Sequence, residues 1–487
     1  MGKLSGIKSA VRVVTQALHI YDPLYSFYAK LKWKGQQKKF FGEFDALLEE
    51  IRQRGAAAPK GKKVIFTGIL ESPKKPTFFP FCEEVQKKLG DVEFVYLDEQ
   101  EAPAAGQERR SHHYMPRASR RAGYDSYLEC VLTPEMEKDL AGDPFLTQMA
   151  EYLHKRQGKN MVLSYAKALV WYYWKTYRTA MEAYRPEAVV IWSKFPALHL
   201  VCDHACKQMG VTPLFMEYGS LPGTFALDTI GQMGESEPSR DFERFRELPV
   251  TEEELYQAGE VLEYLRESRL NRNAQTVQTD ELTMLNKRLK KNRPLVLLAG
   301  QNDFDSGLLP YDEAARANHS PMFRDSYAAM LHMAKLASKY KFNLVYKPHP
   351  AMVDKVKKLK LPPNVIKVLR TDINLIIDMA DVVVTIVSQT GYVSSIRGKT
   401  TLTLGYNQLR GKGATYEAYT LEDIPHALRM ALRHGVTEEM HDKFVLHTAQ
   451  MLRYNLYDDM ADRSLRFGQT TDDAADFFRR NCRPMAK

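Results

Sequence analysis

Long apolar runs are absent from this chain of 487 residues. Apolar runs such as 295–299 and 382–384 fall far short of the roughly 20 residues that span a bilayer, so we expect no transmembrane helix. The N-terminal segment also lacks the continuous apolar stretch and the small-residue cleavage site of a secretory signal. These absences favour a cytoplasmic protein.

Cysteine is scarce. The five cysteines are scattered and never spaced as C-x-x-C: Cys82, Cys130, Cys202, Cys206 and Cys482. That pattern excludes a disulfide framework and a structural zinc site, and it indicates reduced thiols. Cys202 and Cys206 lie one helical turn apart, near His199 and His204. Because no second ligand cluster accompanies them, we expect the packed face of a helix rather than a metal site.

Repeats, low-complexity tracts and recognised nucleic-acid-binding motifs are also missing, so we expect no nucleic-acid partner. The composition, 44% hydrophobic and 26% charged, is that of a folded globular protein. At about 150 residues per domain, the length corresponds to roughly three domains.

The net charge of +9 is unevenly distributed. Residues 1–40 contain eight basic residues and one acidic residue, Asp22, which gives this arm a net charge of +7. Apolar and aromatic residues such as Leu24, Phe27, Leu31 and Trp33 are interleaved with the lysines. Two interpretations stay open: an amphipathic segment on an anionic inner leaflet, or a solvated basic helix pair packed on the body.

Apolar strands alternating with helical patterns predict two α/β regions. The first has strands at 62–70, 92–98, 188–193 and 212–219, a loop at 103–125, and helices at 134–184 and 197–209. The second has strands at 294–300, 342–350, 365–369, 381–387 and 401–405 and helices at 326–340, 375–379 and 422–432, the pattern of a doubly wound parallel sheet. The predicted domains are a basic amphipathic arm (1–58), a first α/β domain (59–250), a helical connector (251–292), a second α/β domain (293–435) and C-terminal helices (436–487).

Ligands of open parallel sheets bind outside the carboxyl ends of the strands, and polar segments follow three predicted strands of the second region. In the first, at 300–307, glycines permit close approach and the Gln301 and Asn302 amides offer donors and acceptors, although a simple turn explains the segment nearly as well. In the second, Lys347 supplies a cation, while Pro348 and Pro350 fix the backbone around His349.

The third polar segment is Ser388-Gln389-Thr390-Gly391. A serine N-cap with free backbone N–H groups at a helix start is suited to phosphate, although capping alone would also place a serine here. The three segments together therefore predict an anion-binding site at the carboxyl edge of the second sheet.

Three stretches, FMEYGSLPGTFALDTIGQ, YKPHP and MADVVVTIVSQTGYVSSIRGKTTLTLG, resemble the capsule polysaccharide biosynthesis proteins that include the Kdo transferases of bacterial capsule lipid linkers. The resemblance covers residues 186–432. It implies an α/β GT-B glycosyltransferase, in which two Rossmann-like doubly wound domains face each other across a cleft. It places the acceptor on domain 59–250 and the donor nucleotide on domain 293–435, and it implies no obligatory metal or other cofactor.

The resemblance also assigns residues. It implies that His349 and Pro350 match the nucleotide-binding motif of the family, and that Ser388, Gln389 and Thr390 match its phosphate-contacting segment. Gln301 would match a polar residue after the first donor-domain strand, and Glu217 and Asp228 would match acidic positions that face the cleft. The basic arm and residues 100–160 match nothing in the family, which leaves the acceptor open.

The chemistry of sugar transfer agrees with these roles. Negative charge develops on the departing phosphate and the acceptor hydroxyl loses a proton, so the site needs anion stabilisation and a base. Lys347, His349 and the helix start at Ser388 can supply the first, and Glu217 or Asp228 the second. A hydrogen-bonded carboxylate for Glu217 and a turn residue for Asp228 stay open as alternatives.

Asp303 and Asp305 have the D-x-D spacing of a metal motif, but in this glycine-containing loop we expect solvated carboxylates and no bound metal.

The sequence thus predicts a metal-independent glycosyltransferase that moves a sugar from a nucleotide-activated donor, first of all CMP-Kdo, to a bacterial surface or capsule glycan. Two alternatives are a CDP-polyol-dependent polyol-phosphate transferase of the teichoic-acid type and a non-enzymatic glycan- or lipid-binding scaffold. The expected partners are the nucleotide-sugar donor, a glycan or glycolipid acceptor and, through residues 1–40, the inner face of the plasma membrane. The expected location is cytoplasmic and peripheral to that membrane.

Overall fold

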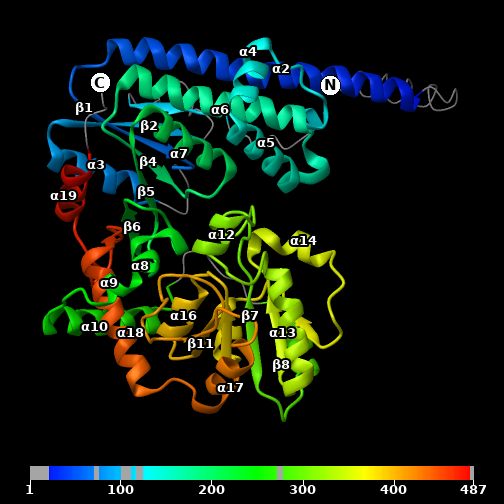
Figure 1. Cartoon of the computed structure of the whole chain (residues 1–487), viewed down its shortest axis with the longest axis vertical. Coiled ribbons are helices and arrows are strands. Elements are labelled where there is room, and N and C mark those ends of the chain that lie inside the picture. The colour runs from blue at the N-terminus through cyan, green and yellow to red at the C-terminus, as the bar shows by residue number, and fades with distance from the viewer. Residues whose placement is uncertain (1–20, 71–75, 100–110, 117–123, 271–277, 483–487) are drawn as a thin grey trace, which may run out of the picture. The chain divides into compact units, whose positions relative to one another are not determined.

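The structure is a computed structural model that describes residues 21–70, 76–99, 111–116, 124–270 and 278–482 (Figure 1). The chain divides into two compact units. The first comprises Met1–Lys60, Leu97–Arg185 and Leu200–Met209, and the second comprises Gly61–Tyr96, Pro186–His199 and Gly210–Lys487. Among the described residues, no helix is both long and apolar enough to cross a lipid bilayer.

The first unit is built on an aromatic helix pair. Its helices are α2 (Tyr21–Ala57), α4 (Pro134–Gly142), α5 (Pro144–Gln157), α6 (Leu163–Tyr184) and most of α7 (Ala197–Met209). The rings of Phe41 and Phe44 on α2 stack on Tyr172 of α6 with centroids 5.2 Å apart. Residues 170–174 are all buried, so the aromatic run of α6 is part of the core.

The cysteine pair of α7 is also buried, and no group of His, Cys, Asp or Glu side chains in the described residues has the arrangement of a metal site. The neighbouring histidines are used locally. His204 contacts the Asp143 carboxylate at 2.7 Å, and the Nδ1 of His199 donates to the carbonyl of Ser193 at 2.6 Å. The prediction of a packed helix face is confirmed.

The N-terminal sheet has seven strands in the order β13-β6-β5-β4-β1-β2-β3. They are β1 (Lys62–Gly68), β2 (Val92–Asp98), β3 (His112–Tyr114), β4 (Ala188–Trp192), β5 (Thr212–Tyr218), β6 (Thr224–Asp228) and β13 (Leu456–Asp458). β1, β4 and β5 pair in parallel, whereas β6 and β13 are antiparallel. Helices α3 (Phe78–Leu89) and α19 (Thr471–Asn481) share one buried hydrophobic cluster with this sheet.

The C-terminal sheet has six parallel strands in the order β12-β11-β10-β7-β8-β9. They are β7 (Leu295–Ala299), β8 (Asn343–Lys347), β9 (Val365–Lys367), β10 (Val382–Thr385), β11 (Thr400–Thr403) and β12 (Tyr416–Glu417). Because the chain runs outward from β7 in one direction and from β10 in the other, the strand order reverses between these two central strands. A doubly wound sheet binds ligands at such a reversal.

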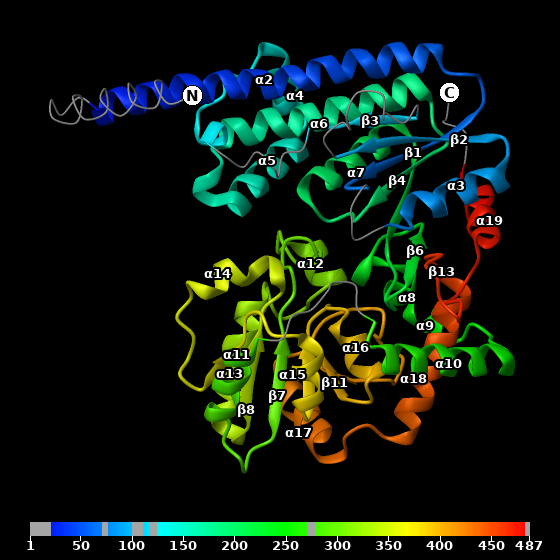
Figure 2. The same cartoon turned by 180° about the vertical axis from the view of Figure 1, so that it is seen from behind.

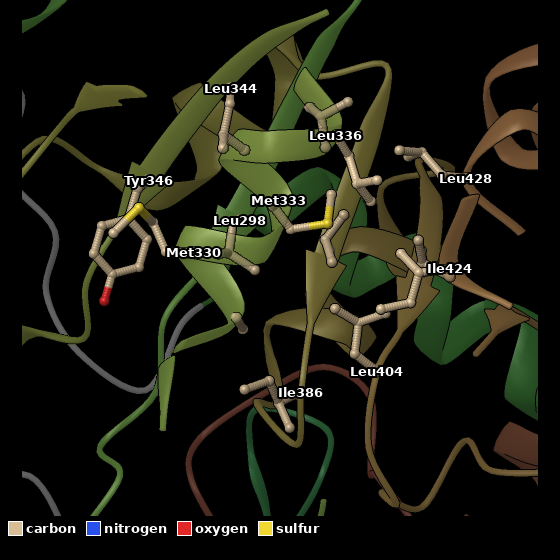
Figure 3. Close-up of a cluster of buried hydrophobic side chains, with 14 of the residues drawn as sticks. Leu298, Met330, Met333, Leu336, Leu344, Tyr346, Ile386, Leu404, Ile424 and Leu428 are labelled. Carbon is tan, nitrogen blue, oxygen red and sulfur yellow. The ribbon is translucent and has the colours of Figure 1, made fainter. Parts of the chain in front are cut away.

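Successive side chains along each strand point to opposite faces of this sheet, and both faces are apolar. Val296 and Leu298 of β7 face a cluster that includes α13 (Ser326–Tyr340) and α17 (Ile424–His434), part of which Figure 3 shows. Leu295 and Leu297 face a second cluster with α11 (Thr279–Arg288) and α15 (Ile373–Met379). The α/β class with two Rossmann-like sheets, predicted from the sequence, is confirmed.

The remaining helices connect and cover these sheets, as the turned view in Figure 2 shows. They are α8 (Glu237–Arg240), α9 (Phe242–Arg246), α10 (Glu252–Ser268), α12 (Glu313–Asn318), α14 (Val353–Lys357), α16 (Thr390–Ile396) and α18 (Glu438–Tyr454), with short 3-10 turns η2 (Tyr124–Tyr127), η3 (Gly158–Asn160), η4 (Met233–Glu235) and η5 (Pro350–Met352).

Two sequence expectations need correction. The tail expected to be helical also contains β13, and the loop expected at 103–125 contains β3 in its described part. The first 20 residues of the basic arm lie outside the described residues.

Candidate functional site

A cleft with about 1290 Å³ of space lies within the second unit. Segments that follow strands of both sheets line it: Ser193 after β4, Glu217 of β5, Ser220, residues 299–302 after β7, Lys347–Pro350 after β8, and residues 387–390 after β10. A cleft lined from two Rossmann-like sheets is the GT-B arrangement. It brings the three polar segments singled out in the sequence to one place.

Gln301 holds the reversal point of the C-terminal sheet together. Its Oε1 accepts a hydrogen bond from the N–H of Val387 at 2.9 Å, and its Nε2 donates to Ser306 Oγ at 3.2 Å. The side chain is buried, so both of its ends are used within the protein. Asn302 is likewise engaged, because its amide donates to the Asp305 carboxylate at 2.7 Å. Both residues line the cleft. Gln301 also connects the loop after β7 to the loop after β10.

Lys347 places a buried cation at the end of β8. The side chain is 6% exposed, and its ammonium makes no hydrogen bond or ion pair with any other residue in the described ranges. Burial lowers the pKa of Lys347, while the charges of Glu281 and Asp372 partly offset that effect. A buried ammonium on a cleft wall binds an anion strongly, because little solvation remains to be lost.

His349 stands two residues further along the same wall. Its Nδ1 accepts a hydrogen bond from the N–H of Ala351 at 3.2 Å. The neutral ring therefore carries its proton on Nε2, which makes that atom a hydrogen-bond donor. Pro348 and Pro350 flank the histidine on the cleft wall.

Ser388 is not the N-cap that the sequence predicted. The N-cap of α16 is Gln389, whose side chain makes no capping bond, and Ser388 Oγ instead accepts from the N–H of Thr390 at 3.2 Å. Ser388 also donates its N–H to Thr385 Oγ1 at 3.1 Å, and the helix begins at Thr390, one residue later than a Ser388 N-cap would place it. Gln389 Nε2 donates to the carbonyl of Gly219 at 3.3 Å and thereby links the two sheets across the cleft.

The two candidate carboxylates differ. Glu217 is half-buried and lines both the cleft and a second, smaller cavity with about 500 Å³ of space. The two cavities also share Met233, Val387, Ser388 and Gln389, so they adjoin each other at Glu217.

Asp228 lines only the smaller cavity. Its carboxylate accepts backbone hydrogen bonds from Ile230, Gly231 and Glu237 at 2.7, 3.2 and 2.9 Å. Burial raises the pKa of Asp228 to about 6, although these bonds oppose the shift. The geometry is that of a turn residue, the alternative left open by the sequence.

Asp303 is buried rather than solvated, contrary to expectation. Its carboxylate accepts from the N–H and the hydroxyl of Ser326, at 3.0 and 2.6 Å. Burial raises the pKa of Asp303 to about 7. Asp303 and Asp305 thus have separate partners and form no metal-binding group among the described residues.

Sequence reasoning missed a buried ion pair, one member of which, Lys194, directly follows the cleft residue Ser193. Lys194 Nζ lies 2.7 Å from the Glu235 carboxylate, whose other oxygen is 3.7 Å from His319 Nε2. Burial alone would raise the pKa of Glu235, but His319 and Lys194 outweigh it and lower that pKa to about 2. Gly307 makes room for the imidazole: its φ is +75°, and a Cβ there would lie 2.4 Å from His319 Nε2. No spacing motif could have revealed this group, because its members are 41 and 84 residues apart in sequence.

Ser193 was missed for another reason. It was assigned to the end of a strand, yet it adopts a φ of +58° directly after β4 and lines the cleft. Its position as the first polar residue after an apolar strand was the available signal.

No protein-family model matches the chain, and no curated protein matches it. Solved structures show a distant likeness. One is KpsC from Thermosulfurimonas dismutans, described as a beta Kdo 2,4 transferase, with 17% identity over 55% of this chain and 80% of that chain and a TM-score of 0.39. A beta Kdo 2,7 transferase structure of KpsC from the same organism has 14% identity over 79% and 89% and a TM-score of 0.37. UDP-GlcNAc 2-epimerase from Methanocaldococcus jannaschii has 11% identity over 80% and 99% and a TM-score of 0.35.

Proposed function

We propose that this protein is a glycosyltransferase that moves a sugar from a nucleotide-activated donor to a glycan acceptor. The observation that carries the proposal is the lining of one cleft: the buried ammonium of Lys347, the imidazole of His349 and the Ser388–Thr390 turn line it together with Glu217. These groups supply an anion site and a carboxylate around one space. The proposed domain boundaries are those predicted from the sequence, with the donor on 293–435 and the acceptor on 59–250.

In this proposal the donor phosphate lies against Lys347 and His349. The bond between the anomeric carbon and the phosphate oxygen breaks, and the nucleotide leaves with the electron pair. Lys347 and the Nε2–H of His349 stabilise the negative charge on that oxygen. The acceptor hydroxyl forms the new bond to the anomeric carbon, and its proton passes to the Glu217 carboxylate. Glu217 suits this role because it stands where the cleft adjoins the second cavity.

The finer identity of the substrates rests on the sequence resemblance. It favours CMP-Kdo as the donor and a bacterial surface or capsule glycan as the acceptor. We also propose that α2 brings the enzyme to the inner face of the membrane. Phe27, Tyr28 and Leu31 are 64%, 63% and 55% exposed on this helix and stand among exposed lysines at positions 30, 32, 34, 38 and 39. Exposed aromatics among lysines are typical of helices that lie on anionic lipid.

The decisive experiment measures CMP release and sugar transfer from CMP-Kdo by the full chain, with CDP-glycerol as the competing donor. We expect turnover with CMP-Kdo, and we expect His349→Ala to reduce it by about 100-fold or more. The matched control is His426→Ala, which removes an exposed histidine of α17 that does not line the cleft.

Other outcomes would replace the proposal. Polyol-phosphate transfer from CDP-glycerol would support a teichoic-acid-type transferase instead. A chain that binds glycan or anionic vesicles but turns over no nucleotide donor would be a scaffold. Equal turnover by wild type and the His349→Ala variant would remove His349 from the site.

A further inference from the structure

We propose that the outer edge of the C-terminal sheet carries a docking strip for an anionic polysaccharide. The inference rests on the proposed function, because the polymer held there would be the acceptor glycan whose end enters the cleft. It goes beyond that function by naming the acceptor's charge and the surface that recognises it.

The strip is the most strongly charged part of the C-terminal domain. Residues 278–372 contain 17 lysines and arginines against 9 aspartates and glutamates. Ten of these cations make up the strip, all exposed except the half-buried Lys367: Lys287, Arg288, Lys290, Lys291, Lys355, Lys357, Lys358, Lys360, Lys367 and Arg370.

Contacts at β9, the edge strand, join the two halves of the strip. Arg288, at the end of α11, donates to the carbonyls of Pro363 and Val365 at 3.2 and 3.3 Å. From the other half, Lys367 Nζ reaches the carbonyl of Lys357 at 3.4 Å. The strip is therefore one surface, although its residues come from two separate stretches of sequence.

One end of the strip adjoins the cleft. Lys355 Nζ lies 3.9 Å from the centre of the Phe304 ring, in the loop whose residues Asn302 and Asp305 line the cleft. Helix α14, which carries Lys355, follows the cleft residue Pro350 after a single 3-10 turn. A polysaccharide lying along these lysines would reach the cleft without leaving the positive surface.

The positive charge of the strip is largely unmatched. Apart from Lys355, none of its residues takes part in an ion pair within the described ranges. Four carboxylates stand on or beside the elements of the strip, against its ten cations: Asp280, Glu281, Asp354 and Asp372. Glu281 accepts from the N–H groups of Arg370 and Thr371 at 2.9 Å, and Asp372 caps α15. Like charges held together repel one another, so such a surface attracts a polyanion.

The chemistry of the strip favours a sugar polymer over lipid or nucleic acid. No aromatic side chain is strongly exposed on its described elements, and the exposed large apolar residues there are Met284 and Leu359, at 39% and 38%. Bilayer binding uses apolar insertion, and single-stranded nucleic acid uses aromatic stacking. Eight of the ten cations are lysines, mobile point charges that suit carboxylates spaced along a flexible chain.

The test measures the affinity of the full chain for fluorescently labelled oligogalacturonate, a carboxylate-bearing polysaccharide, across a salt series, with labelled dextran as the neutral polymer. The variant K357E/K358E/K360E reverses three exposed charges of the strip. The matched control K60E/K138E/K155E makes the same charge change at exposed lysines elsewhere. A second variant, K287E/K290E/K291E, reverses the other half of the strip.

We expect salt-dependent binding of oligogalacturonate by the wild type and none of dextran. Both strip variants should bind at least about tenfold more weakly at 0.1 M salt, while the control stays within about twofold. Stabilisation by CMP should be unchanged in all three variants, which separates loss of the strip from loss of the nucleotide site. Unchanged oligogalacturonate affinity in both strip variants would overturn the proposal. So would a result in which the strip variants lose binding to phosphatidylserine vesicles but keep binding to the polysaccharide.

Discussion

The Asp228 carboxylate accepts a hydrogen bond from the backbone N–H of Glu237 at 2.9 Å. Two further N–H groups, from Ile230 and Gly231, bind the same carboxylate. A carboxylate with three backbone donors holds a turn and is poorly placed to take a proton from a substrate. Glu217 lines the larger cleft as well as the smaller cavity, and this difference in position gives the first prediction.

The Glu217→Gln variant should lose turnover, whereas the Asp228→Asn variant should lose stability. Glu217→Gln should lower the turnover number by about 100-fold or more with little change in melting temperature, since it removes the proposed base. Asp228→Asn should destabilise the fold by about 1–3 kcal/mol, because an amide nitrogen then faces a backbone N–H. Steady-state kinetics and thermal unfolding of both variants check this. A large loss of turnover confined to Asp228→Asn would exchange the two roles.

Asp303 should make the fold less stable as the pH rises. Its folded pKa of about 7 lies above the ordinary value of 3.8, so protonation of Asp303 favours the native state. This contribution to the free energy of unfolding is complete below about pH 4 and is lost between about pH 4 and 7. Asp303→Asn keeps the Ser326 bonds and removes the titration. The variant should match the wild type at about pH 3.5 and unfold at a higher temperature at pH 8. Equal melting temperatures of the wild type and Asp303→Asn at pH 8 would show that ionisation of Asp303 does not lower the stability of the folded state.

Removing the carboxylate of Glu235 should be costly. Glu235→Gln leaves the ammonium of Lys194 buried without its counter-charge, which costs on the order of 3–5 kcal/mol. Because the folded pKa of Glu235 is about 2, against an ordinary 4.5, the wild-type advantage should hold above pH 4.5 and disappear as the pH falls toward 2.

Denaturant unfolding of Glu235→Gln should be compared with Glu263→Gln, which breaks the exposed pair with Arg266 and should leave the unfolding midpoint nearly unchanged. Equal losses of unfolding free energy in the two variants would mean that the buried Lys194–Glu235 pair contributes no more stability than the exposed pair.

Chelation should leave the transferase rate unchanged. Asp303 is bonded to Ser326 and Asp305 to Asn302, so neither carboxylate is set to hold a divalent cation. Dialysis against EDTA should change the rate by less than about twofold, and added Mg²⁺ or Mn²⁺ should not raise it. Stimulation by about tenfold or more would point to a metal-assisted leaving group.

Much of the fold was predictable because strands and helices leave a local apolar pattern. The ranges 92–98 and 197–209 match β2 and α7 residue for residue. The polar segments after β7, β8 and β10 also converge, since a parallel sheet gathers the carboxyl ends of its strands at one edge.

What the sequence could not reveal depends on distant contacts. The group of Lys194, Glu235 and His319 exists only because the fold brings three loops together. The turn role of Asp228 depended on the backbone N–H groups of residues 230–237, which bind its carboxylate. A three-residue strand such as β13 has too short a pattern to stand out between two helices.

That short strand bears on the order of folding during synthesis. β13 adds to the open side of β6, and Phe477 and Phe478 of α19 complete the cluster beneath β1 and β2. All six strands of the C-terminal sheet, by contrast, lie between residues 295 and 417. The later-translated Rossmann domain can therefore close first on the ribosome, while the earlier one waits for residues 456–481 to emerge and carries an unpaired strand edge until then.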